Sequence, residues 1–379
     1  MYTPFVYWKL VQGKNFTNRE NELARLKQNF ISGINTILIS PRRWGKSSLV
    51  KRAGDEVLGT TKSVRIVHLD MFNIRTEEDF YKYLSENLLR AVSGKLEDWV
   101  QNSKKFLKKL MPRITFSPEE LQEVSFVLNW TDVVKQPDEI LDLAENIAND
   151  KGIKIVICID EFQNLSYFEK PLDFQKKLRS HWQNHSNVSY CLYGSKRNML
   201  MEVFASPSMP FYKFGDLMFL QKISSEYWKK FIQERFNSTG KKIRKKQAEK
   251  IALLVENHPY YVQQLAQLCW LRTDKEVDDE IIEETLNSLA LQLSLLFQNM
   301  TENLSTSQVN FLRALLDGVK MFSSIETLRN YSLGTSANIS RIKGALINKE
   351  IIDENTPGKI ELLDPVYRYW LKEYYFNYQ

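Results

Sequence analysis

The 379-residue sequence lacks the features that mark membrane, secreted and metal-thiolate proteins. No run approaches the roughly 18 consecutive apolar residues that a membrane-spanning helix needs, so no membrane partner is expected. The opening residues Met1-Tyr-Thr-Pro-Phe have no basic lead before an apolar run, as a signal peptide would have. The cysteines, Cys158, Cys191 and Cys269, stand singly without metal-ligand spacing. We therefore expect reduced thiols and a cytoplasmic protein.

The sequence also lacks internal repeats, low-complexity segments and a strong net charge. The formal net charge of +6 permits a polyanionic partner without requiring one. Hydrophobic residues make up 43% of the chain and charged residues 26%, a balance typical of proteins with substantial cores. At this length we expect about two or three domains.

Short apolar runs rich in β-branched residues alternate with helix-like stretches through residues 1–223. Continuous apolarity is typical of strands covered on both faces, as in a parallel sheet. The expected strands are 36–40, 64–69, 153–160, 188–194 and 217–220, and the expected helices are 19–32, 46–57, 77–95, 137–150 and 171–185. The alternation predicts an α/β domain over residues 1–223.

Three further segments depart from this alternation. Residues 98–135 read as a basic helix and a hairpin, an insertion that is either regulatory or a flap over the sheet, with the flap favoured. Residues 224–303 are helical in pattern and predict a lid domain. Residues 304–379 predict a winged-helix domain, because helices expected at 306–316, 324–331 and 336–349 precede a hairpin turning at Pro357-Gly358 and a helix at 364–376.

The segment Ser40-Pro-Arg-Arg-Trp-Gly-Lys-Ser-Ser48 follows the first expected strand and opens a helix. This is the context of a phosphate-binding P-loop (Walker A). Its backbone amides and helix N-terminus bind phosphate, Lys46 reaches the β and γ phosphates, and the Ser47 hydroxyl holds Mg²⁺. The usual first glycine is replaced by Ser40. We expect nucleotide contacts from Ser40, Pro41, Arg42, Arg43, Trp44, Gly45, Lys46, Ser47 and Ser48.

An apolar strand ending in Asp160-Glu161 strengthens this interpretation. Such a Walker B aspartate binds magnesium, usually through water, and the adjacent glutamate can act as general base toward the attacking water. The chain has no Asn-Lys-x-Asp motif for reading guanine. We therefore predict ATP rather than GTP as the nucleotide.

These motifs, with Phe16-Thr-Asn-Arg-Glu, Ile159-Asp-Glu-Phe-Gln-Asn-Leu and Leu192-Tyr-Gly-Ser, resemble the archaeal-type ATPase family of AAA-like and STAND P-loop proteins. The resemblance extends to Asp364-Pro-Val-Tyr-Arg-Tyr-Trp370, which follows a winged-helix domain in such proteins. It implies a P-loop parallel sheet, ATP and Mg²⁺ binding, slow hydrolysis and a switch-like cycle.

The resemblance also implies roles for single residues. Ser195 takes the place of a polar sensor of the γ-phosphate, or else is a turn serine. Arg19 lies in the segment that lines the adenine pocket, or else caps a helix. Pro259 fits the lid's Gly-x-Pro sensor but the glycine is absent, so His258 is the nucleotide contact proposed there. Arg197 and Lys213 are candidates for a charge-stabilising finger.

A basic stretch, Lys241-Lys-Ile-Arg-Lys-Lys246, can follow a nucleic-acid backbone or form a solvated helix face. The predicted winged helix has balanced charge, although Ser336, Asn338, Ser340, Arg341 and Lys343 in its third helix can enter a major groove or serve a protein partner. Three functions follow: an ATP-driven conformational switch, a DNA-binding regulator in which ATP controls assembly, and a ring motor. The motor ranks last because no convincing finger is present. The oligomeric state stays open.

Overall fold

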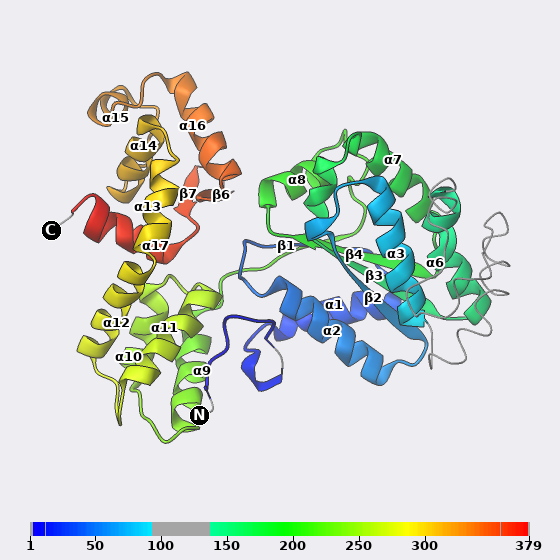
Figure 1. Cartoon of the computed structure of the whole chain (residues 1–379), viewed down its shortest axis with the longest axis horizontal. Coiled ribbons are helices and arrows are strands. Elements are labelled where there is room, and N and C mark those ends of the chain that lie inside the picture. Colours follow the sequence, from blue (N-terminus) through cyan, green and yellow to red (C-terminus); the bar gives the residue numbers. More distant parts are fainter. Residues whose placement is uncertain (1–2, 12, 93–136, 357, 378–379) are drawn as a thin grey trace, which may run out of the picture. The chain divides into compact units, whose positions relative to one another are not determined.

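The computed structural model describes residues 3–11, 13–92, 137–356 and 358–377. They form two compact units, one of Arg19–Gln221 and one of Met1–Asn18 with Lys222–Gln379 (Figure 1). The expected insertion at 98–135 lies outside the described residues. Among the helices that the structure describes, none is both long and apolar enough to cross a membrane.

A five-stranded, wholly parallel sheet forms the centre of the unit 19–221, which confirms the predicted α/β class. Each strand lies within a residue or so of its predicted place. In spatial order the strands are β2 (Val64–Asp70), β3 (Lys154–Asp160), β4 (Val188–Gly194), β1 (Thr36–Ile39) and β5 (Asp216–Phe219). Strands β3, β4 and β1 are consecutive and parallel, so their carboxyl ends lie next to one another at the same edge of the sheet.

Helices cover both faces of this sheet (Figure 1). On one face Val67 and Leu69 of β2 join a buried core with α3 and α6. On the other face Ile66 lies against Gly54 of α2, where an added β-carbon would stand 3.3 Å from its Cγ2 atom. The helices are α1 (Glu20–Ser32), α2 (Lys46–Thr60), α3 (Glu77–Val92), α6 (Pro137–Lys151), α7 (Pro171–Trp182) and α8 (Arg197–Ala205), with short 3₁₀ turns at Met71–Asn73 and Phe162–Tyr167.

The second unit is built mainly from helices. A 3₁₀ turn at Gly13–Asn15 precedes α9 (Ser225–Asn237), α10 (Lys245–Leu254), α11 (Pro259–Arg272), α12 (Asp279–Gln292), α13 (Ser294–Glu302), α14 (Thr306–Leu316), α15 (Ile325–Asn330) and α16 (Ser336–Asn348). An antiparallel pair, β6 (Ile352–Thr356) and β7 (Lys359–Leu362), follows α16. The last predicted helix is present as α17 (Pro365–Trp370), which continues as a π-helical turn over Leu371–Tyr375.

The N-terminal residues belong to this second unit, although the sequence pattern grouped them with the sheet. Phe5 is fully buried and its ring packs edge-on against Phe231 and Phe236 of α9. The backbone amides of Phe5 and Val6 donate to the side-chain oxygens of Gln267 and Gln263, at 3.3 and 3.4 Å. These contacts anchor an otherwise irregular segment on α9 and α11.

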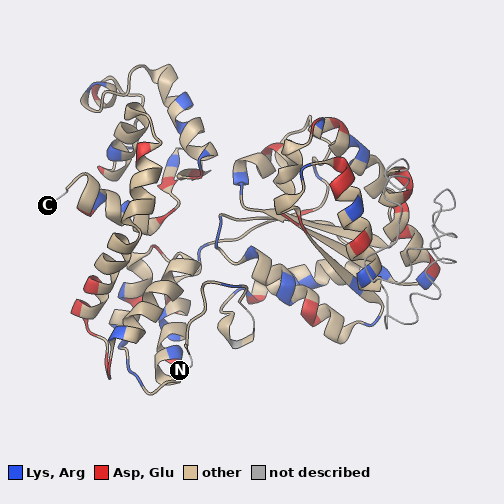
Figure 2. Cartoon of the chain, in the orientation of Figure 1, with Lys and Arg blue, Asp and Glu red and all other residues tan. Residues whose placement is uncertain are grey.

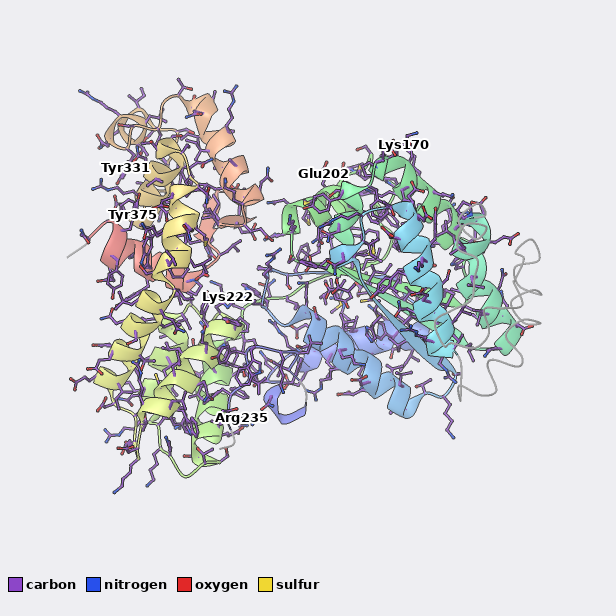
Figure 3. All side chains as sticks on the ribbon, in the orientation of Figure 1. Lys170, Glu202, Lys222, Arg235, Tyr331 and Tyr375 are labelled. Atoms are coloured by element: carbon purple, nitrogen blue, oxygen red, sulfur yellow. The ribbon has the colours of Figure 1, made fainter. Side chains whose placement is uncertain are left out.

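One hydrophobic core runs through the second unit, from α9 to α17. Charged residues add ion pairs at its surface. The ammonium of Lys222, labelled in Figure 3, lies 3.5 Å from Glu256 and 3.6 Å from Glu361 of β7. Arg368 of α17 lies 2.9 Å from Glu256. The segments expected to form a lid and a winged helix are therefore joined within one compact unit.

Candidate nucleotide site

A tight turn joins β1 to α2 at the carboxyl edge of the sheet. Gly45 stands directly before Lys46, the first residue of α2, and has a φ of 90°. Only glycine adopts this left-handed conformation without strain, so Gly45 lets the chain turn sharply into the helix. The N-terminus of α2 therefore lies just after the carboxyl end of β1, and a helix N-terminus favours an anion.

The remaining loop residues divide into an inner and an outer set. Ser40 and Trp44 are buried, as is Ser48 in the first turn of α2, and the Ser40 hydroxyl donates to the Pro41 carbonyl at 3.2 Å. Arg42 and Arg43 are exposed, and Arg42 donates from Nε to the Ser195 hydroxyl oxygen at 3.4 Å. The buried residues fix the loop, and the arginines add positive charge at its rim.

Asp160, the last residue of β3, lies beside the start of α2. The Ser47 hydroxyl donates to Asp160 Oδ2 at 2.6 Å, and the Glu161 amide donates to Asp160 Oδ1 at 2.8 Å. Burial raises the pKa of Asp160, an effect that the Lys46 ammonium and the Ser47 hydroxyl offset only in part. A hydroxyl and a carboxylate thus meet at the point where the two motifs converge.

Glu161 is the centre of a second set of contacts. Its backbone has a left-handed φ of 50°, which turns the chain out of β3. Lys46 Nζ lies 3.3 Å from Glu161 Oε1, and the Ser195 hydroxyl donates to Glu161 Oε2 at 3.0 Å. Burial would raise the pKa of Glu161, but the Lys46 ammonium, Gln163 and Ser195 outweigh it and lower that pKa. The structure therefore brings the side chains of Lys46, Ser47, Asp160, Glu161 and Ser195 together.

Arg19 lies at the start of α1 in the same unit. Its side chain is only 4% exposed and pairs with Glu22 at 3.0 Å, yet its Nη2 atom has no hydrogen-bond partner among the described residues. Burial lowers the pKa of Arg19, an effect that the contact with Glu22 partly offsets. The side chain makes no capping hydrogen bond to α1, so the helix-capping alternative has no support from this contact.

The other residues proposed from the family resemblance belong to other elements. His258 and Pro259 start α11 in the second unit, where the buried His258 ring lies 5.1 Å from that of Tyr261. Arg197 starts α8 and its guanidinium lies 5.5 Å from the Phe219 ring centroid.

Lys213 is exposed, with a left-handed φ of 52°, and follows α8 on the way to β5. The hydrogen bonds and the ion pair given above for Asp160 and Glu161 involve neither Lys213 nor Arg197.

The motif analysis missed Gln163. This residue is 2% exposed, and its Nε2 atom donates to Glu161 Oε2. The available signal was a glutamine two residues after Glu161, directly after the apolar Phe162 and shortly before Leu165, in a segment where an unpaired amide is costly to bury.

Comparison with family models matches residues 16–265 to an ATPase domain found predominantly in Archaea. The chain belongs to this ATPase family. It is accordingly a P-loop ATPase-type protein, as the motifs indicated. No curated protein matches the chain.

Solved structures show the same fold. A Walker-type ATPase of Pyrococcus abyssi superposes with a TM-score of 0.65 at 18% identity, covering 95% of this chain and 97% of that one. The ORC2 protein of Aeropyrum pernix, in ADPNP and ADP complexes, gives a TM-score of 0.53 at 14% identity, covering 92% and 90%. The ORC1 protein of the same organism, in complex with DNA, gives 0.50 at 12% identity, covering 96% and 94%.

Proposed function

We propose that this chain binds ATP with Mg²⁺ and hydrolyses it slowly, and that the cycle works as a conformational switch. The proposal is supported by one observation: Lys46 and Ser47, at the start of α2, lie beside Asp160 and Glu161, at the end of β3. The Ser47 hydroxyl donates to Asp160 at 2.6 Å and the Lys46 ammonium pairs with Glu161 at 3.3 Å, while the Glu161 backbone amide donates to the Asp160 carboxylate at 2.8 Å. Phosphate and magnesium need this combination of cation, hydroxyl and carboxylate.

The chain's own residues fit a magnesium ion. Ser47 and Asp160 supply a hydroxyl and a carboxylate oxygen, the hard donors that Mg²⁺ prefers. Bound there, the ion would neutralise charge developing on the transferred phosphate. Among the described residues no group of three or more His, Cys, Asp or Glu is placed to hold a metal. Magnesium in a P-loop site needs no such group, because phosphates and water complete its shell.

The roles proposed for the remaining residues combine the sequence motifs, the family resemblance and the contacts described above. Lys46 and the backbone amides of residues 42–48 hold the phosphates, Ser40 and Pro41 begin the loop, and Arg19 contacts the nucleotide through its unpaired Nη2. Glu161 accepts a proton from the attacking water, which its lowered pKa permits because the carboxylate stays ionised near neutral pH. Ser195 senses the γ-phosphate beside Glu161. For His258 and Pro259, a nucleotide contact is proposed only from the resemblance to the family's lid motif.

In the switch, hydrolysis repositions the C-terminal domain on a partner. The lid is assigned to residues 224–303 and the winged helix to residues 304–379. Those domain assignments are part of the proposal. Helices α14, α15 and α16 followed by the β6–β7 hairpin support a winged helix by their order.

The test is ATP binding by Lys46→Ala, followed with a fluorescent ATP analogue and Mg²⁺. Removing the buried ammonium takes away the main side-chain charge facing the phosphates, so we expect affinity to fall by about 100-fold or more, the scale of a charge-assisted hydrogen bond in a buried site. Lys51→Ala is the matched control, since Lys51 lies on the same helix but is 39% exposed and pairs with Asp55. Equal affinity for Lys46→Ala and wild type would refute the P-loop assignment.

A DNA-binding regulator is the second candidate. On α16, Ile339, Ile342 and Leu346 are buried while Ser336, Ser340 and Arg341 are exposed, which leaves a polar face for a groove. The ORC1 neighbour was solved with DNA, although its 12% identity speaks only for the fold.

In the basic stretch of residues 241–246, two of the cations already make contacts within the fold. Lys241 donates to the carbonyls of Trp270, at 2.7 Å, and Thr273, and Arg244 pairs with Glu276 at 2.7 Å. Lysines and arginines elsewhere are interspersed with acids on the helices of both units (Figure 2). The DNA footprint proposed here is therefore Lys242, Lys245, Lys246 and Arg341.

Salt-dependent DNA binding separates the two candidates. Lys242, Lys245 and Lys246 can be replaced together by alanine. If they bind phosphates, the plot of log binding constant against log salt concentration should become shallower by about one unit for each phosphate that is no longer neutralised. Lys241→Ala would not report on DNA, because its ammonium holds helix carbonyls. Absence of binding at low salt with ATP or ADP would leave the C-terminal module as a protein-docking domain.

A further inference from the structure

Gln163 is a buried amide that holds the side chain expected to activate water. It lies two residues after Glu161, at the start of the 3₁₀ turn Phe162–Tyr167, and is 2% exposed. Its Nε2 atom donates to Glu161 Oε2, which also accepts from the Ser195 hydroxyl at 3.0 Å and the Ser195 amide at 3.4 Å. Three donors therefore converge on one carboxylate oxygen.

The other oxygen of Glu161 has a different partner. Oε1 lies 3.3 Å from Lys46 Nζ, the ammonium that the proposed function assigns to the phosphates. A phosphate in the loop competes for this ammonium with a larger negative charge. As Lys46 turns toward phosphate, Oε1 becomes available to a water molecule, whereas Oε2 keeps Gln163 and Ser195. The anchors on Oε2 then set where Oε1 points.

Gly194 provides the room for this glutamine. A β-carbon at Gly194 would lie 1.9 Å from Gln163 Oε1, closer than these atoms can approach, and 3.0 Å from its Cδ, so the Gln163 side chain would have to shift. The φ of Gly194 is outside the left-handed region, so the backbone does not call for glycine. Gly194 ends β4 and pairs with Ile39, the residue before the phosphate loop. The absent side chain at this point admits the Gln163 amide beside Glu161.

We propose that Gln163 is a positioning residue that orients Glu161 for water activation, and that Gly194 is required because it leaves space for the Gln163 amide. This inference rests on the proposed ATPase function. It assigns to Gln163 no contact with ATP or with the reacting atoms. Its effect should therefore fall on the turnover step and not on nucleotide affinity.

The first test is Gln163→Met, which keeps the length and volume of the side chain but removes its donor. We expect kcat to fall by about tenfold or more, the scale of one hydrogen bond to a charged group, while the Kd for the fluorescent ATP analogue changes by less than about twofold. Gln163→Ala should lose at least as much turnover. A kcat for Gln163→Met within about twofold of wild type would overturn the inference, because the missing hydrogen bond would then have no catalytic consequence.

The second test is a double-mutant cycle with Gly194→Ala. If the new methyl group acts only by displacing Gln163, Gly194→Ala alone should lower kcat as Gln163→Ala does, and the double variant should lose no more than Gln163→Ala alone. Losses that multiply would show that Gly194 has a separate structural role and would overturn that half of the inference. Gly59→Ala is the control, since Gly59 is exposed on α2 with nothing within 4 Å of an added β-carbon.

Failure of the inference can be told apart from failure of the proposed function. Wild-type protein that hydrolyses no ATP refutes both. Wild-type turnover that is lost in Glu161→Gln but kept in Gln163→Met refutes only the role of Gln163. Urea unfolding of each variant, with midpoints compared to wild type, shows whether a fall in kcat comes from loss of the folded protein.

Discussion

Replacing Glu161 by glutamine should weaken hydrolysis and strengthen ATP binding at the same time. The Lys46–Glu161 pair is largely buried, with side chains 8% and 19% exposed, and its charges lie 3.3 Å apart. At an effective dielectric constant of about 20, Coulomb attraction over that distance is about 5 kcal/mol. Desolvation of two buried charges cancels most of it, and about 1 kcal/mol of net competition with phosphate for Lys46 remains.

Glutamine keeps the shape of Glu161 but removes this competition. We therefore expect Glu161→Gln to bind ATP about fivefold more tightly, since about 1 kcal/mol corresponds to that factor. Turnover should fall by about 100-fold or more, the scale of losing a general base. The assays are equilibrium titration with a fluorescent ATP analogue and steady-state phosphate release.

The control is Glu202→Gln, because Glu202 is an exposed carboxylate on α8 of the same unit (Figure 3). It should alter neither quantity. Wild-type turnover in Glu161→Gln would place the base elsewhere, and tenfold weaker ATP binding would show that the Lys46–Glu161 pair supports the loop instead of competing with phosphate.

Three further outcomes are expected. Asp160→Asn should raise the Mg²⁺ concentration needed for half-maximal turnover by about tenfold, as a carboxylate ligand becomes neutral; an unchanged Mg²⁺ dependence would exclude Asp160 as a ligand. Phe5→Ala should lower the free energy of unfolding of the second unit by about 3 kcal/mol, the usual loss for a fully buried phenylalanine, when followed by urea unfolding. Burial lowers the pKa of His68 to about 4 from an ordinary 6.5, so the unfolded chain binds the extra proton first and stability falls as the pH drops below 6.5. Between pH 7 and pH 5 this loss is about 2 kcal/mol, and His68→Gln should lose correspondingly less.

The sheet and its loops could be predicted because their signals are local. Each strand is a continuous apolar run, and Gly45-Lys46 and Asp160-Glu161 mark two strand ends without knowledge of the rest of the chain. Parallel pairing then places these ends on one edge of the sheet. Spacing along the chain could not reveal that the Gln163 amide shares an oxygen with Ser195, because that contact depends on the turn after β3.

Contacts between residues far apart in the chain could not be predicted from the local sequence pattern. Phe5 lies against α9 through packing with residues more than 200 positions away, which no local periodicity encodes. Lys241 looks like one lysine in a solvated basic stretch, yet its ammonium caps the carbonyls at the end of α11 and lies 4.5 Å from the Trp270 ring centroid. The number of charges along a sequence does not show which lysines form hydrogen bonds within the folded protein.

The network around Glu161 links the proposed binding and chemistry steps through one ammonium. In the structure Lys46 neutralises Glu161, so the carboxylate is held but its Oε1 atom is engaged. Phosphate in the loop would draw Lys46 away and leave Glu161 anchored only through Oε2, by Gln163 and Ser195. The base is then released for water activation only when the phosphates are in place. Such an arrangement couples water activation to occupancy of the loop, and the proposed slow, switch-like ATPase cycle needs that coupling.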